Sequence, residues 1–193
     1  IYQAAGCVTT VKIIVILRDP IARELSLYNH LAYDCRSLDS SQLSDWHKQV
    51  TRPDNSIMSF DEFVRDVSMP ALSTDDSEDH GLGRSSRHGL YANHLQDWFK
   101  LFDRNQILVL NYVELCKHPQ ILQERIQSFV GRIVPGNLRH ENRNDSPQKV
   151  LMPSREAKQC LESFMKPHNE RLYQLLEAHT GPSMELRPFP RFV

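Results

Sequence analysis

Apolar residues form two short unbroken runs in this chain. The first, Ile13–Leu17, consists of isoleucine, valine and leucine with no polar residue between them. The second lies within residues 106–111, which read QILVLN. Uninterrupted apolar runs of this length are typical of strands that are buried on both faces, as in parallel sheets. We therefore predict two strands of a parallel sheet.

Between the two runs, apolar residues recur every three or four positions, which predicts helices. We expect one helix to begin at Pro20, because proline suits the first helical position, and to end near Tyr33. A second begins after Ser59, with Glu62 three residues on as in a capping box. Pro70 is expected to end it.

Three further helices are predicted downstream. The helix over residues 90–102 has apolar positions at 3–4 spacing, with Leu95 and Trp98 expected in the core. The helix after the second strand is expected to end at Gly131, a C-cap residue. In the C-terminal helix, a break is expected at the Lys-Pro dipeptide that ends at Pro167. Strands that alternate with helices predict a parallel α/β fold.

Two polar stretches separate these elements. Residues 35–57 are predicted to form a long surface loop with one short helix. Residues 73–80, STDDSEDH, are predicted to form a solvated acidic loop. A metal site is the alternative for this acidic stretch, although it lacks the glycine and the spacing of a calcium loop.

Length and composition narrow the class of protein. At 193 residues, with 40% apolar and 24% charged residues, the chain is expected to form a single domain over residues 1–193. The net charge of −1 gives no overall reason to expect a nucleic-acid partner. No apolar run is long enough to span a bilayer, and no signal peptide is visible. The four cysteines are far apart, which favours isolated thiols over disulfides.

Candidate chemistry follows the first strand directly. Arg18 stands at the carboxyl end of that strand, and Arg23 and Ser26 lie three residues apart on the next helix. In open α/β sheets this edge binds anionic ligands, and guanidinium groups match phosphate oxygens. The residues thus indicate a phosphate site. The alternative is that both arginines form surface ion pairs.

The string R-D-P-x-x-R-x-x-S-x-Y closely resembles the 3′-phosphate-binding segment of sulfotransferases that use 3′-phosphoadenosine 5′-phosphosulfate (PAPS). In that family the strand-end arginine and the helix serine hold the 3′-phosphate of the nucleotide. The resemblance assigns these roles to Arg18 and Ser26. Arg23 matches a recurrent motif position and is included among the expected nucleotide-binding residues.

Three later segments follow in the family's order, and they most resemble the heparan sulfate N-/3-O-sulfotransferase branch. Residues 81–102 match an R-x-x-L/W-Y-x-x-H-L-x-x-W pattern, which makes Arg87 and His94 candidate acceptor contacts. The second strand and its helix match next, and the C-terminal F-x-x-P-H-N run matches last. A Lys-Gly-Arg segment closes over the nucleotide in that branch. Here Lys149 is its charged remnant, and the cysteine-bracketed loop of that branch is absent.

The resemblance implies a P-loop-NTPase-like, three-layer α/β domain with a central parallel sheet. It also implies that the chain is a C-terminal fragment. The 5′-phosphosulfate loop and the catalytic base are expected before Ile1, so no catalytic residue is named in this chain. The implied activity is transfer of a sulfuryl group from PAPS to a hydroxyl or amine of an acceptor, without a metal.

The implied partners are the nucleotide donor and a carbohydrate acceptor, and the implied compartment is the Golgi lumen, with a membrane-anchored parent protein. Two alternatives stay open at this point. One is a non-catalytic nucleotide- or glycan-binding remnant that lacks the 5′-phosphosulfate loop. The other is a relative of P-loop kinases, which would need a phosphate loop before Ile1 and metal-holding acids after a strand.

Overall fold

The computed structural model divides the chain into two compact units. Unit 1 comprises Ile1–Asp19, Tyr91–Glu141 and His168–Val193, and unit 2 comprises Pro20–Leu90 and Asn142–Pro167. The structure describes residues 11–74, 84–133, 135–139, 149–150, 152–178 and 189–192. Most of the acidic stretch at 73–80 and Cys7 lie outside the described residues.

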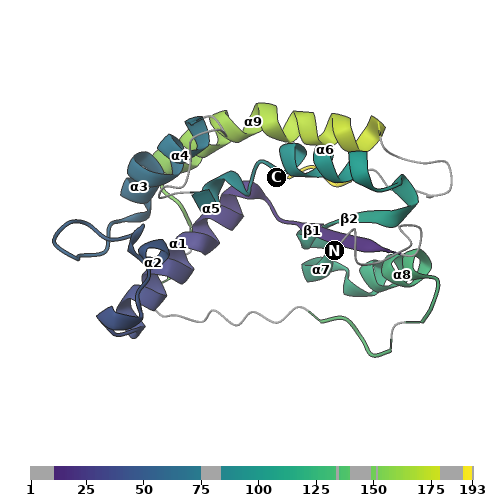
Figure 1. Ribbon diagram of the computed structural model, residues 1–193, viewed down its shortest axis with the longest axis horizontal. Helices are drawn as coiled ribbons and strands as arrows, with labels where there is room; N and C mark the ends of the chain where they lie inside the picture. The colour runs from purple at the N-terminus through teal and green to yellow at the C-terminus, as the bar shows by residue number, and fades with distance from the viewer. Residues whose placement is uncertain are drawn as a thin grey trace. The chain divides into compact units, whose positions relative to one another are not determined.

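Unit 1 is built around a parallel pair of strands (Figure 1). In the described residues its elements are β1 (Ile13–Leu17), α6 (Tyr91–Leu101), the short 3₁₀ turn η4 (Arg104–Gln106), β2 (Ile107–Asn111), α7 (Tyr112–Lys117), α8 (Pro119–Val130) and the C-terminal part of α9 (Arg155–Ala178). Ile13 pairs with Ile107, and the register continues to Leu17 and Asn111. The two predicted strands are therefore confirmed, and they are parallel.

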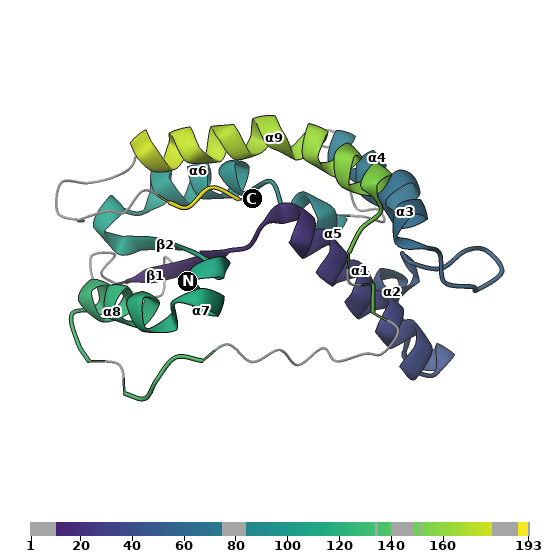
Figure 2. The ribbon, with the colours of Figure 1, turned by 180° about the vertical axis from the view of Figure 1, so that it is seen from behind.

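Helices cover both faces of this sheet, which gives three layers. On one face Leu17 packs with Leu95 of α6 and Leu172 of α9. On the other face Leu108 and Leu110 of β2 pack on α7 and α8. The view from behind shows the same order, with α7 and α8 across the sheet from α6 (Figure 2). The apolar residues that the sequence placed in strands thus form the centre of an α/β sandwich.

The prediction that β1 is buried on both faces is wrong for two of its residues. Ile14 and Ile16 are 40% and 43% exposed. They share a sheet face with Leu108 and Leu110, their register partners in β2, which are buried beneath α8. The described part of α7 and α8 thus covers that face over β2 and leaves it open over β1.

The expectation that Trp98 lies in the core is also wrong. The buried face of α6 carries Ala92, Leu95 and the partly buried Phe99, whereas Trp98 is 46% exposed. Trp98 is rotated from Phe99 by about 100° around the helix. Its ring stacks instead on the ring of Phe102, with the centroids 5.7 Å apart.

Unit 2 is mostly helical. In the described residues its elements are α1 (Pro20–Ser37), the 3₁₀ turn η2 (Ser40–Gln42), α2 (Asp45–Lys48), α3 (Phe60–Phe63), the π-helical turn η3 (Val64–Ser68), α4 (Met69–Ser73), α5 (Arg84–Arg87) and the first part of α9. Its core contains Leu31 of α1, Phe63 of α3 and Leu161 of α9, each fully buried.

Helix α1 begins at Pro20 as predicted but ends at Ser37, one turn beyond the predicted end near Tyr33. The amphipathic pattern continues, because Cys35 packs against the core while Arg36 is exposed. The polar stretch that follows contains η2 and α2 and then reverses direction, with Thr51 bridging to Ile57 in an antiparallel pair. The expected short helix is therefore confirmed, with a 3₁₀ turn in addition, whereas the expected surface loop over residues 35–57 is wrong at its start, which belongs to α1, and at Val50, which is buried in the core.

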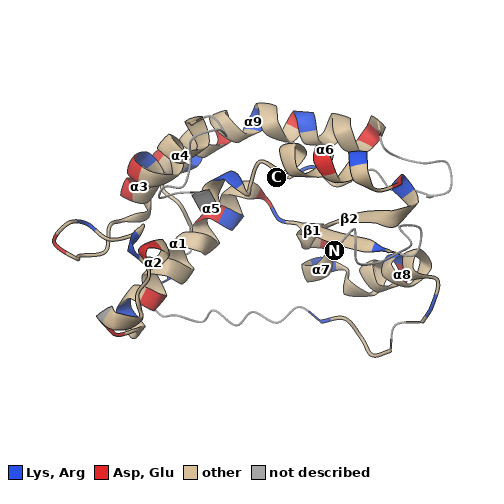
Figure 3. Cartoon of the chain, viewed as in Figure 1, with Lys and Arg blue, Asp and Glu red and all other residues tan. Residues whose placement is uncertain are grey.

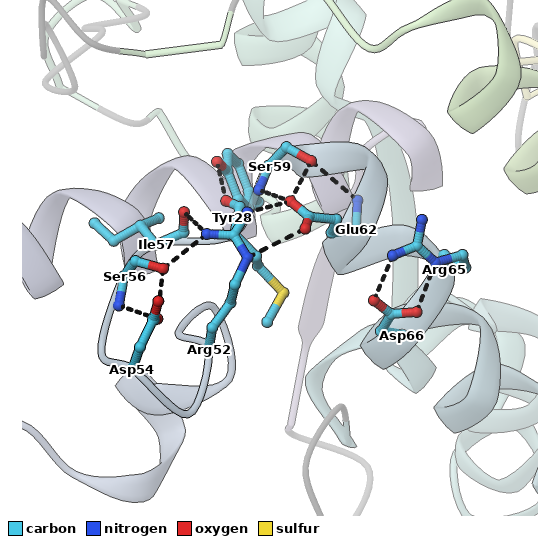
Figure 4. Close-up of polar contacts among 10 residues, drawn as sticks. Tyr28, Arg52, Asp54, Ser56, Ile57, Ser59, Glu62, Arg65 and Asp66 are labelled. Atoms are coloured by element: carbon cyan, nitrogen blue, oxygen red, sulfur yellow. Dashed lines mark hydrogen bonds and ion pairs between the residues drawn. The ribbon is translucent and has the colours of Figure 1, made fainter.

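The N-terminus of α3 has the predicted capping box (Figure 4). Glu62 N–H donates to the Ser59 hydroxyl, and the Glu62 carboxylate accepts from the Ser59 backbone N–H at 2.7 Å. Arg52 adds an ion pair of 2.5 Å to the same carboxylate. The hydrogen bonds from Arg52 and Ser59 lower the pKa of Glu62 to about 2. The carboxylate is thus a fixed acceptor that joins the loop before α3 to its first turn.

Pro70 does not end the helix, contrary to the prediction. The chain passes from α3 through the π turn η3 and continues as α4 to Ser73. Met69 N–H donates to the Val64 carbonyl across this wider turn. A widened turn directly before a proline relieves the clash between its ring and the preceding turn, and the missing proline N–H falls at the start of the next helical segment.

The predicted break at Pro167 is absent, because α9 runs through it as one helix from Arg155 to Ala178. Apolar contacts hold the helix on both sides of the proline: Leu161 and Met165 are buried in unit 2, and Leu172 is buried in unit 1. The boundary between the two compact units nevertheless falls directly after Pro167.

Each unit contains one of the chain's two tryptophans. Trp98 lies on α6 of unit 1, and Trp46 lies on α2 of unit 2. The Trp46 indole N–H donates to the Ser85 hydroxyl at 2.9 Å. Its ring makes edge contacts with the rings of His30 and His47, at centroid distances of 5.7 and 5.1 Å.

Candidate functional site

The carboxyl end of β1 places Arg18 beside Tyr112. Leu17 pairs with Asn111, so the next residues, Arg18 and Tyr112, leave the two strands at the same sheet edge. The Arg18 guanidinium carbon lies 5.1 Å from the centroid of the Tyr112 ring. The Arg18 carbonyl accepts a hydrogen bond of 2.9 Å from the Tyr91 hydroxyl. Aromatic residues of unit 1 therefore hold both the side chain and the backbone of Arg18.

The Arg18 guanidinium has no carboxylate partner among the described residues, where its side-chain contact is the stack on Tyr112. A half-buried guanidinium without a counter-ion is suited to bind phosphate, because its N–H groups form a fork that matches two phosphate oxygens. Burial raises the pKa of the Tyr112 hydroxyl; Cys116 adds to this rise and Arg18 opposes it. The Tyr112 ring therefore stays neutral beneath the cation at neutral pH.

Arg23 lies in the first turn of α1, and its contacts join α1 to α5 within unit 2. Its Nη2 donates to the Ser85 carbonyl at 2.8 Å. Its Nη1 lies 3.6 Å from the Glu24 Oε2 atom. These contacts give Arg23 a supporting role for α5. The nucleotide contact that the family resemblance implies for Arg23 stays a prediction.

Glu24 is a fully buried carboxylate that the sequence analysis did not single out. It is 0% exposed and accepts hydrogen bonds from the Ser68 hydroxyl at 3.0 Å and from the Ser86 hydroxyl. Burial raises its pKa, whereas Ser86, Arg23 and Ser68 oppose that rise. Spacing could have revealed it, because Glu24 lies four residues before Tyr28 on the apolar face of α1.

Ser26 lies one turn beyond Arg23 on α1 and is half-buried. In the parts of the chain that the structure describes, its hydroxyl forms no hydrogen bond with another residue. A half-buried hydroxyl of this kind is able to donate to an incoming anion.

Lys149 belongs to a two-residue segment that is attached to the same helix. Its neighbour Val150 exchanges two hydrogen bonds with Asn29: the Asn29 side-chain N–H donates to the Val150 carbonyl, and the Val150 N–H donates to the Asn29 Oδ1 atom, both at 2.8 Å. Asn29 lies one turn beyond Ser26 on α1. The structure thus brings the segment that carries Lys149 to the helix that carries Ser26.

The sequence analysis also missed Asn29. A signal for it was present, because asparagine is a poor residue for a helix interior and this one stands among the apolar residues of α1. Its partner lies 121 residues away, and no local pattern in the sequence indicates such a pairing.

The two candidate acceptor contacts are described in different units. Arg87 is the last residue of α5 in unit 2 and is half-buried, and the neighbouring Ser86 is fixed by Glu24. His94 lies on the exposed side of α6 in unit 1. Their role as acceptor contacts stays a prediction.

Three further observations concern the chemistry that the chain offers. The described residues contain no group of three or more His, Cys, Asp or Glu side chains placed to hold a metal ion. Cys35, Cys116 and Cys160 are free thiols. None of the helices among the described residues is both long enough and apolar enough to cross a membrane.

Charge is distributed over both units. Figure 3 shows Lys and Arg together with Asp and Glu on the helices of each unit. Against this mixed background, Arg18 at the end of β1 has no carboxylate partner, and Ser26 on α1 has no hydrogen-bond partner for its hydroxyl, within the part of the chain that the structure describes. A cation at the carboxyl end of a parallel strand, followed by a helix with a hydroxyl, defines the class of α/β proteins that bind anionic groups at a sheet edge.

Comparison with known proteins identifies the family within this class. A family model described as the sulfotransferase domain matches residues 7–151. The chain is 28% identical to human carbohydrate sulfotransferase 15 over 179 residues, which cover 86% of this chain and 30% of that protein. It is 23% identical to carbohydrate sulfotransferase 15 of Nototodarus sloanii over 154 residues, which cover 75% of this chain and 95% of that protein.

A solved structure supports the fold. The crystal structure of a sulfotransferase from Alicyclobacillus acidocaldarius aligns with a TM-score of 0.56 and 21% identity, over 86% of this chain and 54% of that chain. The chain belongs to the sulfotransferase domain family, and the expected α/β fold with a parallel sheet is confirmed. It spans about 30% of the length of the mammalian relatives that it matches.

Proposed function

We propose that this chain is the nucleotide-binding part of an enzyme that transfers a sulfuryl group from PAPS to a hydroxyl or amine of a carbohydrate. The main observation that supports this proposal is Arg18, whose half-buried guanidinium at the carboxyl end of β1 has no carboxylate partner among the described residues. It stands at the family's position for 3′-phosphate binding. The names of the relatives, carbohydrate sulfotransferase 15, support a carbohydrate acceptor.

In this proposal the 3′-phosphate accepts paired N–H donors from Arg18 and a hydroxyl donor from Ser26. Arg23 and Lys149 add positive charge to the same nucleotide. Arg87 and His94 contact the acceptor. Because the 3′-phosphate is retained in both the donor and the product nucleotide, these contacts bind and orient the donor and take no part in bond breaking.

The reaction itself is an in-line displacement at sulfur. The acceptor oxygen or nitrogen forms a bond to sulfur while the bond between sulfur and the bridging phosphate oxygen breaks. A base takes the acceptor proton, and 3′-phosphoadenosine 5′-phosphate leaves with the electron pair of the broken bond. The proposed compartment is the Golgi lumen, which the family resemblance implies.

The nucleotide site is tested by calorimetric titration of the 193-residue chain with 3′-phosphoadenosine 5′-phosphate and with 5′-AMP. A charge-assisted contact to the additional phosphate is worth about 2–3 kcal/mol, or roughly 30–150-fold in Kd. Arg18→Ala and Ser26→Ala should each reduce this difference between the two nucleotides. Arg36→Ala and Ser37→Ala, at exposed positions in the last turn of α1, are matched controls that should leave it unchanged. Equal affinity of the unaltered chain for the two nucleotides would overturn the assignment.

The transfer activity needs its own test. The test uses a protein in which this chain is preceded by the segment expected to carry the 5′-phosphosulfate loop and the base. Incubated with PAPS and a glycosaminoglycan, it should release 3′-phosphoadenosine 5′-phosphate in proportion to the sulfate that the glycan gains. Discrimination between the two nucleotides without any sulfate transfer by that longer protein would indicate a non-catalytic binding protein instead.

A further inference from the structure

The pairing of Asn29 with Val150 joins residues 121 positions apart in unit 2 through two hydrogen bonds. Asn29 is 7% exposed, and both ends of its side-chain amide are used, one as a donor and one as an acceptor. A buried amide that lost these partners would be left unsatisfied, which is costly. The pairing therefore fixes one particular residue, Val150, against α1.

This contact sets the position of Lys149. Val150 packs against the core of unit 2 and its backbone is held by Asn29, so the preceding residue has little freedom to move along the helix. On α1, Ser26 and Asn29 are three residues apart, and residues at this spacing are neighbours on one helix face. Lys149 is thus attached directly to a residue that is anchored one helical turn from Ser26.

We propose that Asn29 is a positioning residue that holds the Lys149–Val150 segment on α1, so that the Lys149 ammonium and the Ser26 hydroxyl bind the same 3′-phosphate. This inference rests on the function proposed above. It adds a buried amide to the nucleotide site that itself makes no contact with the nucleotide. The competing explanation is that the pairing only stabilises unit 2.

The test compares Kd for 3′-phosphoadenosine 5′-phosphate with Kd for 5′-AMP in Asn29→Ala, Lys149→Ala and the double variant. Loss of one charge-assisted contact to phosphate should weaken binding of the first nucleotide by about 10-fold, with little change for 5′-AMP. If Asn29 acts through Lys149, Asn29→Ala should reproduce most of this loss. The double variant should then bind about as well as Lys149→Ala alone, because both changes remove the same contact.

Ser68→Ala is the matched control for a purely structural effect. Ser68 is buried in unit 2 and donates to Glu24 at 3.0 Å, so its removal should destabilise the unit without touching the Lys149–Val150 segment. It should lower the free energy of unfolding and leave the ratio of the two Kd values unchanged. An equal fall of this ratio in Ser68→Ala and Asn29→Ala would overturn the positioning role.

Failure of this inference can be told apart from failure of the proposed function. If Arg18→Ala and Ser26→Ala lose discrimination but Lys149→Ala binds both nucleotides like the unaltered chain, the role of Asn29 is overturned and the nucleotide site stands. This comparison does not require the Asn29 variant to fold. If the unaltered chain does not discriminate between the nucleotides, the proposed function is wrong, and this inference falls with it.

Discussion

The Arg18 guanidinium lies on the Tyr112 ring at 5.1 Å, and this stack determines which direction the N–H fork faces. Tyr112→Leu should therefore weaken the binding of 3′-phosphoadenosine 5′-phosphate by about 2- to 5-fold, the usual worth of a cation–π contact near the surface. Tyr112→Phe keeps the aromatic face and should bind almost normally. Calorimetry on both variants checks this prediction, which equal binding by Tyr112→Leu and the unaltered chain would contradict.

The buried Glu24 makes stability depend on pH. Burial raises its pKa above the ordinary value of 4.5, so the folded state holds a proton that the unfolded state releases. Its contribution to stability is fully present below pH 4.5, falls as the pH rises above 4.5, and is lost once the pH exceeds the raised pKa of the folded state. Glu24→Gln should remove this dependence.

Urea unfolding of both proteins between pH 5 and pH 8 measures the effect. The free energy of unfolding of the unaltered chain should fall relative to that of the glutamine variant as the pH rises. Glu162→Gln, at an exposed position on α9, is the matched control and should show no such trend. Parallel pH profiles for the unaltered chain and Glu24→Gln would show that Glu24 does not titrate between the two states.

Local chemistry made several elements predictable from sequence. The capping box of Ser59 and Glu62, the proline at the start of α1 and the left-handed Gly131 after α8 each need only a few neighbouring residues. The continuation of helices through Pro70 and Pro167 was not predictable, because it depends on a π turn in one case and on packing along both sides of α9 in the other. The prediction that Trp98 of α6 lies in the core was wrong for a similar reason, because tertiary packing decides which face of the helix is buried.

The residues of the proposed nucleotide site also divide into those that can be predicted from the local sequence and those that depend on the fold. Arg18 and Ser26 could be singled out from sequence because they stand in a motif that follows a strand and resembles the 3′-phosphate-binding segment of the family. The contacts of Tyr112 with Arg18, of Asn29 with Val150 and of Glu24 with Ser68 could not be predicted, because each joins residues more than 40 positions apart along the chain. The residues that we propose to contact the nucleotide could be named from the motif, whereas the residues that hold them in place could be named only from the fold.

The capping box of α3 makes the stability of the protein depend on pH in the acidic range. Arg52 and Ser59 lower the pKa of Glu62 from 4.5 to about 2, so the folded state holds this carboxylate ionised where the unfolded chain would protonate it. The stability that Glu62 contributes is present above pH 4.5 and is lost as the pH falls toward 2.

Glu62→Gln should therefore be less stable than the unaltered chain at pH 7, and the gap should close between pH 4.5 and pH 2. Thermal unfolding across this range measures it. Asp61→Asn is the matched control: Asp61 shares the first turn of α3, but its side-chain carboxylate forms no hydrogen bond with another of the described residues. If the gap stays constant down to pH 2, Glu62 is not held by these bonds.

On the scale of the whole chain, α9 supplies a buried leucine to the core of each compact unit. Leu161 packs in unit 2 and Leu172 in unit 1, and both are at most 1% exposed. Replacing either by alanine should cost about 2–5 kcal/mol of stability, as for other buried leucines. The expectation of a single domain over residues 1–193 stays a prediction, and the two compact units are defined by contacts between segments that lie far apart along the chain.

Amide hydrogen exchange separates the effects of the two leucine variants. Leu161→Ala should speed exchange in α1 and α3, and Leu172→Ala should speed it in β1, β2 and α6, if each unit opens by itself. Identical exchange patterns in the two variants would show instead that the units unfold together.

Because each compact unit contains one tryptophan, tryptophan fluorescence can report on each unit separately. Trp46 belongs to unit 2 and Trp98 to unit 1, so Trp98→Phe leaves an emission spectrum that comes from unit 2 alone, and Trp46→Phe leaves one from unit 1 alone. Trp98 is 46% exposed and stacks on Phe102, whereas Trp46 is 36% exposed, donates its indole N–H to Ser85 and contacts two imidazole rings, and the two spectra should therefore differ in wavelength. Nucleotide binding and unfolding can then be followed in each unit separately, without any added label.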